Sequence, residues 1–365
     1  MSGASSVVVE GLPFARIVGV GSAFPEKTFT QEGLFAALGL KNKVSKKVFT
    51  AAHIQKRHLM LGDPDPVTGL IKHETTEEMQ EKFRTGSALV GGEAINKALE
   101  NAGITKDDIS CLIAVTSSGF MCPGLSCLFI RELNLPHHIQ RVDVVGMGCN
   151  AGLNGMLALN GWSRQNPGKY GVMICCEINT ATYSPDDTAR DGIVNSLFGD
   201  GASACVVRSD DGNKELDGKG PKVLTFSSHI VPEEWGAMRF DWHPGHHRFH
   251  FFLSKDIPYI LGVHAGTPVQ RLLEAGGIRK GDVEHWVIHT GGGSVIDAIK
   301  MKLNLSEHDV RHTRSVLRDY GNLSSGSFLV SYERLLQEDV VRKGDYGVMM
   351  TMGPGAQIET ALLQW

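Results

Sequence analysis

The chain has 365 residues, of which 42% are hydrophobic and 21% charged, and its formal net charge is −4 at pH 7. A chain of this length buries a large core and is long enough for two domains or a duplicated one. No long run of one charge occurs, which argues against nucleic-acid binding and against electrostatic docking on a membrane. A small-molecule ligand is therefore expected.

Neither a membrane span nor a disulfide framework is expected. Residues 1–6 show no basic segment followed by an apolar one, and no later apolar run is long enough to cross a bilayer. An odd number of cysteines without a secretion signal argues against disulfides, and there is no CxxC pair of the kind that indicates structural zinc. The sequence therefore predicts a soluble, cytoplasmic protein with seven reduced thiols: Cys111, Cys122, Cys127, Cys149, Cys175, Cys176 and Cys205.

The N-terminal part predicts ordinary structural elements. Residues 16–23 (RIVGVGSA) are typical of a strand that ends in glycines, and residues 31–40 of a short helix. The GVG of residues 19–21 lacks the third glycine of a nucleotide loop, so we interpret it as a turn. Taken alone, the basic pair Lys56 and Arg57 indicates a solvated surface.

An internal repeat is the strongest signal for the fold. Residues 99–116 (LENAGITKDDISCLIAVT) and 273–290 (LEAGGIRKGDVEHWVIHT) match at an offset of 174 positions. The tetrapeptide YGVM recurs at residues 170–173 and 346–349, at an offset of 176. Two matches in series indicate a duplicated α/β unit, and the polar stretch 209–221 marks the boundary between its copies.

We therefore predict two similar α/β halves, residues 1–220 and residues 221–365, that pack together. Helices that alternate with apolar strands predict largely parallel sheets covered by helices. In such sheets, ligand sites lie at the carboxyl ends of the strands.

The stretch 144–154 (VVGMGCNAGLN) places a thiol between an apolar run and an amphipathic segment. We interpret it as strand, tight turn and helix, with Cys149 in the turn. A helix N-terminus favours thiolate because its backbone N–H groups are unpaired and its dipole end is positive. Most free cysteines are instead buried structural residues, and this stretch alone favours that interpretation.

The repeat brings two further polar groups near Cys149. Its offset carries Cys149 into the small polar turn 320–327 (YGNLSSGS), so the two turns are expected to face each other. His289 ends the second repeated strand and is expected to point into the same cleft. Taken alone, His289 is more simply a hydrogen-bonded histidine at a strand end, and Asn322 a helix N-cap. The coincidence of all three residues at related turns favours a site.

These three residue types can perform acyl transfer. His289 would hold Cys149 as a thiolate–imidazolium pair for attack on an acyl thioester. The amide of Asn322 and Nε2–H of His289 would bind the oxyanion or enolate that forms when a thioester is attacked or a malonyl group loses carbon dioxide. A cysteine protease uses the same residue types, but a duplicated parallel α/β fold does not favour that function.

Several motifs occur in a characteristic order: GMGCNAG around Cys149, NSLFGDGA at 195–202, HTGG from His289, DYGNLSSGS at 319–327 and MGPG at 352–355. With them, the chain resembles the type III polyketide synthases, the chalcone synthase-like enzymes of the thiolase superfamily, from about residue 14 onward. The resemblance implies a thiolase-like duplicated αβαβα layered fold with two pseudo-symmetric halves. The first half would carry the nucleophilic cysteine, and the second the histidine and the asparagine.

The stretches DVVGMGCNAGLN, IVNSLFGDG, VLRDYGNLSSGSF and DYGVMMTMGPG are most similar to the bacterial subfamily that makes 3,5-dihydroxyphenylacetyl-CoA. That resemblance implies an acyltransferase that uses malonyl-CoA as starter and extender and cyclises the chain to this thioester or its acid. The alternatives are another type III product (tetrahydroxynaphthalene, an alkylresorcinol or a pyrone) and a ketoacyl-carrier-protein synthase III-like condensing enzyme. A degenerate binding module of the same fold is the non-enzyme alternative, against which the intact trio argues.

The resemblance also assigns roles to individual residues. It implies Cys149 as the acyl-accepting nucleophile, His289 as its activator and an oxyanion donor, and Asn322 as the decarboxylation partner. Phe198 and Phe251 match gatekeeping aromatics between the CoA tunnel and the cavity, where apolar rings withdraw solvation from a carboxylate and so favour its loss as carbon dioxide. The further matches are Lys56 and Arg57 for CoA binding, and Thr182, Ser324, Cys122, Gly353 and Gly355 for the cavity wall.

Cys122 departs from the pattern of the plant members, in which a methionine at this place reaches into the partner subunit's cavity. Some bacterial naphthalene-forming members also carry cysteine there. The shape of this wall, on which chain length and cyclisation depend, therefore does not follow from the resemblance.

The resemblance implies a homodimer whose partners are malonyl-CoA and coenzyme A, without nucleic acid or membrane. It implies no metal and no organic cofactor, because the thioester and the lost carbon dioxide supply the driving force. Residues 241–251 (DWHPGHHRFHF) predict a β-hairpin with four histidines: His243, His246, His247 and His250. A metal site there is an alternative that the implied chemistry does not require, and none is expected.

Overall fold

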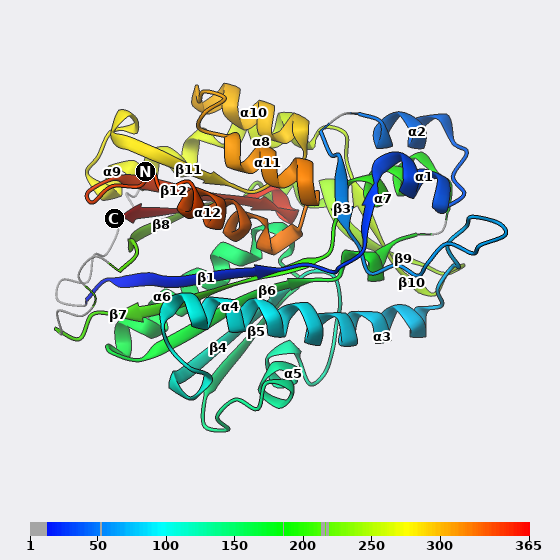
Figure 1. The fold of residues 1–365 in the computed structure, drawn as a ribbon. Helices are drawn as coiled ribbons and strands as arrows, with labels where there is room; N and C mark the ends of the chain where they lie inside the picture. Colours follow the sequence, from blue (N-terminus) through cyan, green and yellow to red (C-terminus); the bar gives the residue numbers. More distant parts are fainter. Residues whose placement is uncertain (1–12, 52, 185, 213–215, 217–218) are drawn as a thin grey trace.

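The structure is a computed structural model that describes residues 13–51, 53–184, 186–212, 216 and 219–365 (Figure 1). Within these residues the large sheet has nine strands in the order β11-β12-β13-β8-β1-β7-β6-β4-β5. The strands are β1 (Ala15–Ala23), β4 (Ile109–Thr116), β5 (Gln140–Val145), β6 (Tyr170–Glu177), β7 (Gly201–Ser209), β8 (Lys222–His229), β11 (Val283–Ile288), β12 (Tyr346–Gly353) and β13 (Gln357–Gln364).

Helices cover this sheet in layers. Met156 of α6 and Phe328 of α12 share one apolar cluster with Ile113 and Met349, so these two helices lie between strands of both halves. Helices α4 and α5 cover the outer face of the first-half strands, and α8, α9 and α10 that of the second-half strands. The predicted αβαβα layering is confirmed. The helices are α1 (Gln31–Ala37), α2 (Lys43–Phe49), α3 (Thr76–Gly86), α4 (Gly92–Ala102), α5 (Leu125–Glu132), α6 (Ala151–Gln165), α7 (Ala189–Leu197), α8 (Ile257–His264), α9 (Gly266–Gly276), α10 (Gly293–Leu303), α11 (Arg311–Tyr320) and α12 (Ser327–Gln337).

The repeat seen in the sequence is a repeat of structure. Helix α4 ends before Gly103 (φ +70°) and α9 before Gly277 (φ +66°), and both glycines adopt the left-handed conformation that ends a helix at little steric cost. A short helical turn follows in each copy, and then a buried strand, β4 or β11. The local sequence thus sets the same helix stop and strand start twice.

The prediction of largely parallel sheets is wrong. Among the described strands of this sheet, only β4 with β5, β4 with β6, and β11 with β12 pair in parallel, whereas β1, β7, β8 and β13 pair antiparallel with their neighbours. One antiparallel pair has a local cause: β12 and β13 are joined by the short turn Pro354–Ala356, and a connection this short reverses the chain direction. Strands β6 and β7 are also antiparallel although α7 lies between them, so an intervening helix does not by itself make two strands parallel.

Two small two-stranded sheets lie beside the layers. Strands β2 (Thr28–Thr30) and β3 (Lys56–His58) pair antiparallel, as do β9 (Met238–His243) and β10 (Arg248–Leu253). The second pair confirms the hairpin predicted at residues 241–251, and it lies next to α7 in Figure 1. The strand and the helix predicted near the N-terminus are confirmed as β1 and α1.

The two turns that the repeat relates do meet. Cys149 lies in a helical turn (Gly148–Asn150) between β5 and α6, and the turn Ser324–Gly326 precedes α12. The two backbone segments come so close that a Cβ atom added at Gly152 would lie 2.4 Å from the carbonyl oxygen of Ser325. Only glycine fits there, so the small residues of both motifs allow the approach.

Candidate active site

Cys149 occupies the strand-to-helix turn that its sequence predicts. The side chain is buried, and its sulfur lies 3.4 Å from the hydroxyl oxygen of Ser324. Burial raises the pKa of the Cys149 thiol to about 12, and the contact with Ser324 opposes that rise without reversing it. In the free protein the residue is therefore a thiol.

His289 follows β11 and lies in the same region. Its Nδ1 lies 2.5 Å from the hydroxyl oxygen of Ser327, and this hydroxyl also donates to the carbonyl oxygen of Ser324. Nε2 is thereby the ring nitrogen left for a ligand. Burial lowers the pKa of His289 to about 3, so its imidazole is uncharged at neutral pH.

These two pKa shifts bear on the predicted thiolate–imidazolium pair. A resting thiolate–imidazolium pair requires Cys149 to lose a proton and His289 to gain one, and burial opposes both changes. Burial thus favours a neutral thiol and a neutral imidazole, both of which line the same cavity. The thiolate–imidazolium pair stays a prediction.

Asn322 is held by backbone pairing with the segment that follows α7. Its N–H donates to the carbonyl oxygen of Leu197, and Phe198 and Asn322 form an isolated parallel bridge. The side-chain oxygen of Asn322 accepts a 2.8 Å hydrogen bond from the N–H of Ser324, which leaves the NH2 group as its donor. Asn322 is not a helix N-cap, because α12 begins only at Ser327.

The three residues line one cavity. The rings of Phe198 and Phe251 also line it and meet edge to face, with centroids 5.7 Å apart and planes at 81°. The rest of the wall consists of Gly291 and apolar side chains: Leu197, Met238, Leu253, Ile257, Leu261, Val295 and Met352. A thiol, an imidazole and an amide thus converge in a largely apolar pocket, as a site for acyl transfer requires.

A chain of polar contacts connects Ser324, the residue in contact with Cys149, to a buried carboxylate, and it was not identified from the sequence. The hydroxyl of Ser324 contacts that of Ser117 at 3.3 Å, and Ser117 in turn bonds to the carboxylate of Glu177 at 3.1 Å. Glu177 is fully buried, accepts the N–H groups of Ser117 and Ser118, and has a pKa raised by burial. Ser117 and Glu177 lie at the carboxyl ends of β4 and β6, and that position was the available signal.

The expected contact between Arg57 and CoA is wrong. Arg57 is fully buried, and its guanidinium donates to the carbonyl oxygens of Asn195 and Phe198 and to the side chains of Tyr183 and Gln31. A phosphate outside cannot reach a group whose donors point inward. Arg57 instead fixes the backbone at Phe198, while its neighbour Lys56 is exposed.

The other predicted cavity residues lie outside the cavity wall described above. Thr182 is half-buried and bonds to the carbonyl of Asn179, and Cys122 is exposed in the loop before α5. A Cβ added at Gly353 would clash with Asn150, so Gly353 packs against the turn that carries Cys149. Gly355, with φ of +76°, lies near Ile230. Their contact with substrate stays a prediction.

Comparison with known proteins identifies the family. A model of the chalcone and stilbene synthase N-terminal domain matches residues 4–211, and one of the C-terminal domain matches residues 225–365. The chain belongs to the chalcone and stilbene synthase family. It is a type III polyketide synthase, an acyltransferase-type enzyme of a family that uses CoA thioesters.

The similarity to individual relatives extends over nearly the whole chain of this type III polyketide synthase. It is 47% identical to the 3,5-dihydroxyphenylacetyl-CoA synthase of Amycolatopsis orientalis, over 98% of the chain and 96% of the relative. It is 46% identical to the protein of the same name from Streptomyces toyocaensis, over 97% of the chain and 90% of the relative. The fold matches that of PKS-I from the brown alga Ectocarpus siliculosus with a TM-score of 0.88, at 24% identity over 98% of this chain and 99% of that one. Among the described residues, no helix is long and apolar enough to span a membrane.

Proposed function

We propose that this polyketide synthase uses malonyl-CoA as both starter and extender and makes 3,5-dihydroxyphenylacetyl-CoA or its acid. The observation that carries the proposal is the single cavity shared by Cys149, His289 and Asn322 with two aromatic rings. The identity of 47% to a 3,5-dihydroxyphenylacetyl-CoA synthase supports this product over other type III products. The number of carbon atoms agrees with this reaction, because an eight-carbon arylacetyl skeleton needs four two-carbon units.

Loading begins with proton transfer. His289 carries its proton on Nδ1 when Ser327 donates to Ser324, so Nε2 is free to accept the proton of Cys149 as the thiolate attacks the thioester carbonyl. The protonated Nε2 and the NH2 group of Asn322 then donate to the oxyanion. Collapse of this intermediate expels CoA as its thiol and leaves the acyl group on the sulfur of Cys149.

Decarboxylation uses the apolar part of the same cavity. The carboxylate of a second malonyl-CoA would lie against Phe198 and Phe251, which offer it no hydrogen bond. Loss of carbon dioxide removes that charge from the apolar surroundings and leaves an enolate, whose oxygen accepts a hydrogen bond from the NH2 group of Asn322. The enolate carbon attacks the acyl group on Cys149, and the chain grows by two carbons.

CoA itself would bind outside this cavity. Lys56 is exposed on β3, and we propose that its ammonium contacts the CoA phosphates. Arg57 supports the same region from inside, because it holds the backbone carbonyl of Phe198 at 2.7 Å. The activity needs no metal or organic cofactor, since decarboxylation supplies the driving force for each condensation.

We propose that the enzyme is a cytoplasmic homodimer. Val142 and Val145 are each 45% exposed on β5, an edge strand of the sheet, and Leu157 of α6 is 47% exposed. Exposed apolar side chains on a sheet edge are a liability in a monomer and favour an interface.

The seven cysteines are all free, as in a reducing compartment. Light scattering after gel filtration tests the dimer, which a monomer mass would contradict.

Product analysis tests the proposed reaction. The purified protein is incubated with malonyl-CoA as the only substrate, and the products are identified by mass. The proposal predicts 3,5-dihydroxyphenylacetic acid or its CoA thioester. Without malonyl-CoA consumption the self-priming reaction is wrong, and a naphthalene-sized product would contradict the proposed chain length.

A further inference from the structure

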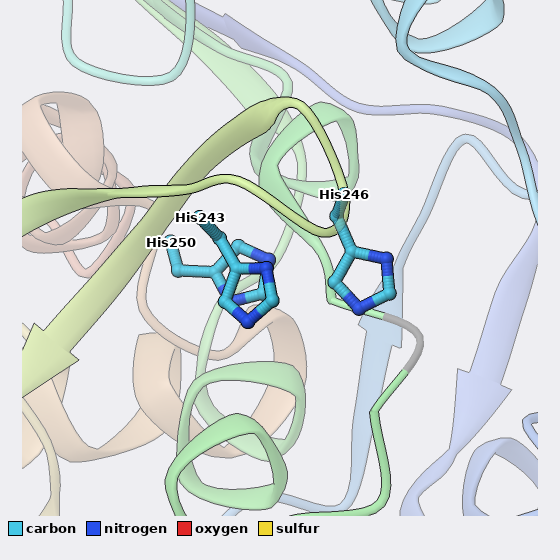
Figure 2. A group of neighbouring side chains, drawn as sticks. All are labelled: His243, His246 and His250. Carbon is cyan, nitrogen blue, oxygen red and sulfur yellow. The ribbon is translucent and has the colours of Figure 1, made fainter.

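Three histidines gather at the end of the β9–β10 hairpin (Figure 2). His243 ends β9, His246 lies in the tip and His250 lies on β10. Their rings stack with centroids 4.4 Å apart between His243 and His250, 4.7 Å between His243 and His246, and 5.5 Å between His246 and His250. One nitrogen of each ring lies within 4.8 Å of those of the other two.

Two of these imidazoles have a nitrogen without a partner. The side chain of His250 is only 4% exposed, and its Nε2 forms no hydrogen bond. The buried Nδ1 of His243 is likewise unsatisfied. Buried polar atoms are usually paired, because leaving them unpaired costs their full desolvation energy. Unpaired nitrogens in a cluster of imidazoles therefore point to a missing ligand.

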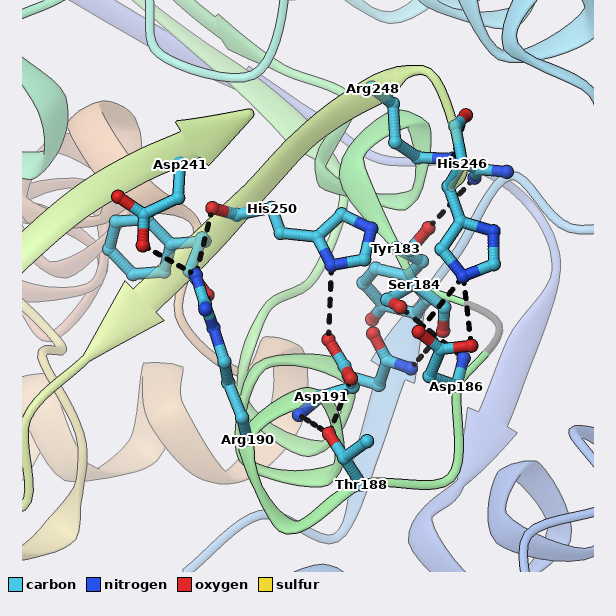
Figure 3. Close-up of polar contacts among 12 residues, drawn as sticks. Tyr183, Ser184, Asp186, Thr188, Arg190, Asp191, Asp241, His246, Arg248 and His250 are labelled. Carbon is cyan, nitrogen blue, oxygen red and sulfur yellow. Dashed lines mark hydrogen bonds and ion pairs between the residues drawn. The ribbon is translucent and has the colours of Figure 1, made fainter. Parts of the chain in front are cut away.

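Two carboxylates complete the cluster (Figure 3). Both oxygens of Asp186 lie 2.9 Å from Nε2 of His246, and an oxygen of Asp191 lies 3.8 Å from Nδ1 of His250. Asp191 is itself fixed, since its carboxylate and its N–H both contact the hydroxyl of Thr188. In His250, the carboxylate of Asp191 near Nδ1 orients the ring and leaves Nε2 for a metal. In His246, Nε2 contacts Asp186, so an ion bound at this nitrogen would also have the Asp186 carboxylate beside it.

We propose that His243, His246 and His250 bind one Zn²⁺ ion, with Asp186 and Asp191 as the neighbouring carboxylates. Three imidazole nitrogens with carboxylate oxygens nearby form a donor set typical of zinc. Zinc–nitrogen bonds of about 2.0–2.1 Å bring the three nitrogens to about 3.4 Å from one another. The stacked rings reach that arrangement by turning about the Cβ–Cγ bond, which is a soft torsion.

The site would be structural rather than catalytic. Its histidines are not part of the wall around Cys149, but they lie in the segments that carry the two aromatic rings of that wall. His250 directly precedes Phe251, and Asp191 lies in α7, which ends before Phe198. A bound ion would therefore link the hairpin to α7 and hold Phe198 and Phe251 in their edge-to-face contact.

Zinc titration of the whole protein tests this site without reference to its activity. The protein is first freed of metal with a chelator, and Zn²⁺ binding is measured by calorimetry. We expect one ion per chain and a rise in the melting temperature. His243→Asn should weaken Zn²⁺ binding by more than about 100-fold, and Asp191→Asn by about 10- to 100-fold, the usual loss for a residue that orients a ligand.

His247→Asn is the matched control. His247 is exposed on the same hairpin tip, and its φ of +48° is one that asparagine readily adopts, so this variant should fold and bind Zn²⁺ unchanged. Circular dichroism of the metal-free proteins shows whether each variant is folded. Absence of Zn²⁺ binding, or binding that folded His243→Asn and Asp191→Asn retain in full, would overturn the proposal. A Co²⁺-substituted protein whose spectrum shows thiolate ligands would place the ion at a cysteine and overturn it as well.

Discussion

The hydroxyl oxygen of Ser327 lies 2.5 Å from Nδ1 of His289, and the same hydroxyl donates to the carbonyl oxygen of Ser324. One side chain thus fixes the imidazole and connects it to the turn that contacts Cys149. This hydrogen-bonding pattern places the proton of His289 on Nδ1 and leaves Nε2 as a base. Acylation of Cys149 in this enzyme therefore starts from two uncharged groups.

Alkylation of Cys149 should reveal its high pKa. Burial raises the pKa of this thiol to about 12, so the rate of reaction with iodoacetamide in the free protein should keep rising above pH 8. The measurement is the mass of the peptide that contains Cys149 after timed alkylation at several pH values. A rate that levels off near pH 6 would show a preformed ion pair with His289.

Burial of neutral His289 should make the protein less stable in acid. Its pKa is about 3 in the folded state and about 6.5 when unfolded, so below pH 6.5 the unfolded state binds more protons and gains relative stability. Between pH 7 and 5.5 the wild type should lose about 1 kcal/mol more than His289→Asn in urea unfolding at one fixed protein concentration. Equal losses in both proteins would mean that His289 is protonated in the folded state.

Removal of the nucleophile should abolish the covalent intermediate. Cys149→Ala should show no acyl adduct after incubation with malonyl-CoA, because no other thiol lines the cavity wall described above. Intact-protein mass spectrometry measures the adduct. Cys127→Ala, at a half-buried cysteine of α5, is the control and should keep it. An adduct that persists in Cys149→Ala would move the loading step to another residue.

Two substitutions of Asn322 separate donation to substrate from support of the turn. Asn322→Asp keeps an oxygen for the N–H of Ser324 but lacks the NH2 donor, whereas Asn322→Ala lacks both. If the NH2 group stabilises the enolate, both variants should release carbon dioxide from malonyl-CoA about 100-fold more slowly than the wild type. Their loading of Cys149 should fall less than carbon dioxide release does, because the protonated Nε2 of His289 also donates to the loading oxyanion. Near-normal carbon dioxide release by Asn322→Asp would leave Asn322 with a structural role alone.

The sequence predicts the local geometry of this site well because the signals are local. The pattern of an apolar strand, a small turn and a helix predicted the position of Cys149. The repeat predicted that the turn with Asn322 faces it. Strand direction was missed because it depends on how each connection runs: a short turn reverses the chain after β12, and β6 and β7 are antiparallel although α7 lies between them. Burial of Arg57 was missed because a basic residue next to Lys56 indicates surface, whereas four internal acceptors are visible only in the fold.

Isotope labelling tests the central claim most directly, namely that malonyl-CoA supplies every carbon of the product skeleton. The enzyme is given malonyl-CoA labelled in its two skeleton carbons together with unlabelled acetyl-CoA, and the product is examined by mass spectrometry. The account predicts 3,5-dihydroxyphenylacetic acid or its CoA thioester with all four two-carbon units labelled. A product with one unlabelled unit would show that acetyl-CoA is the starter and would contradict the account.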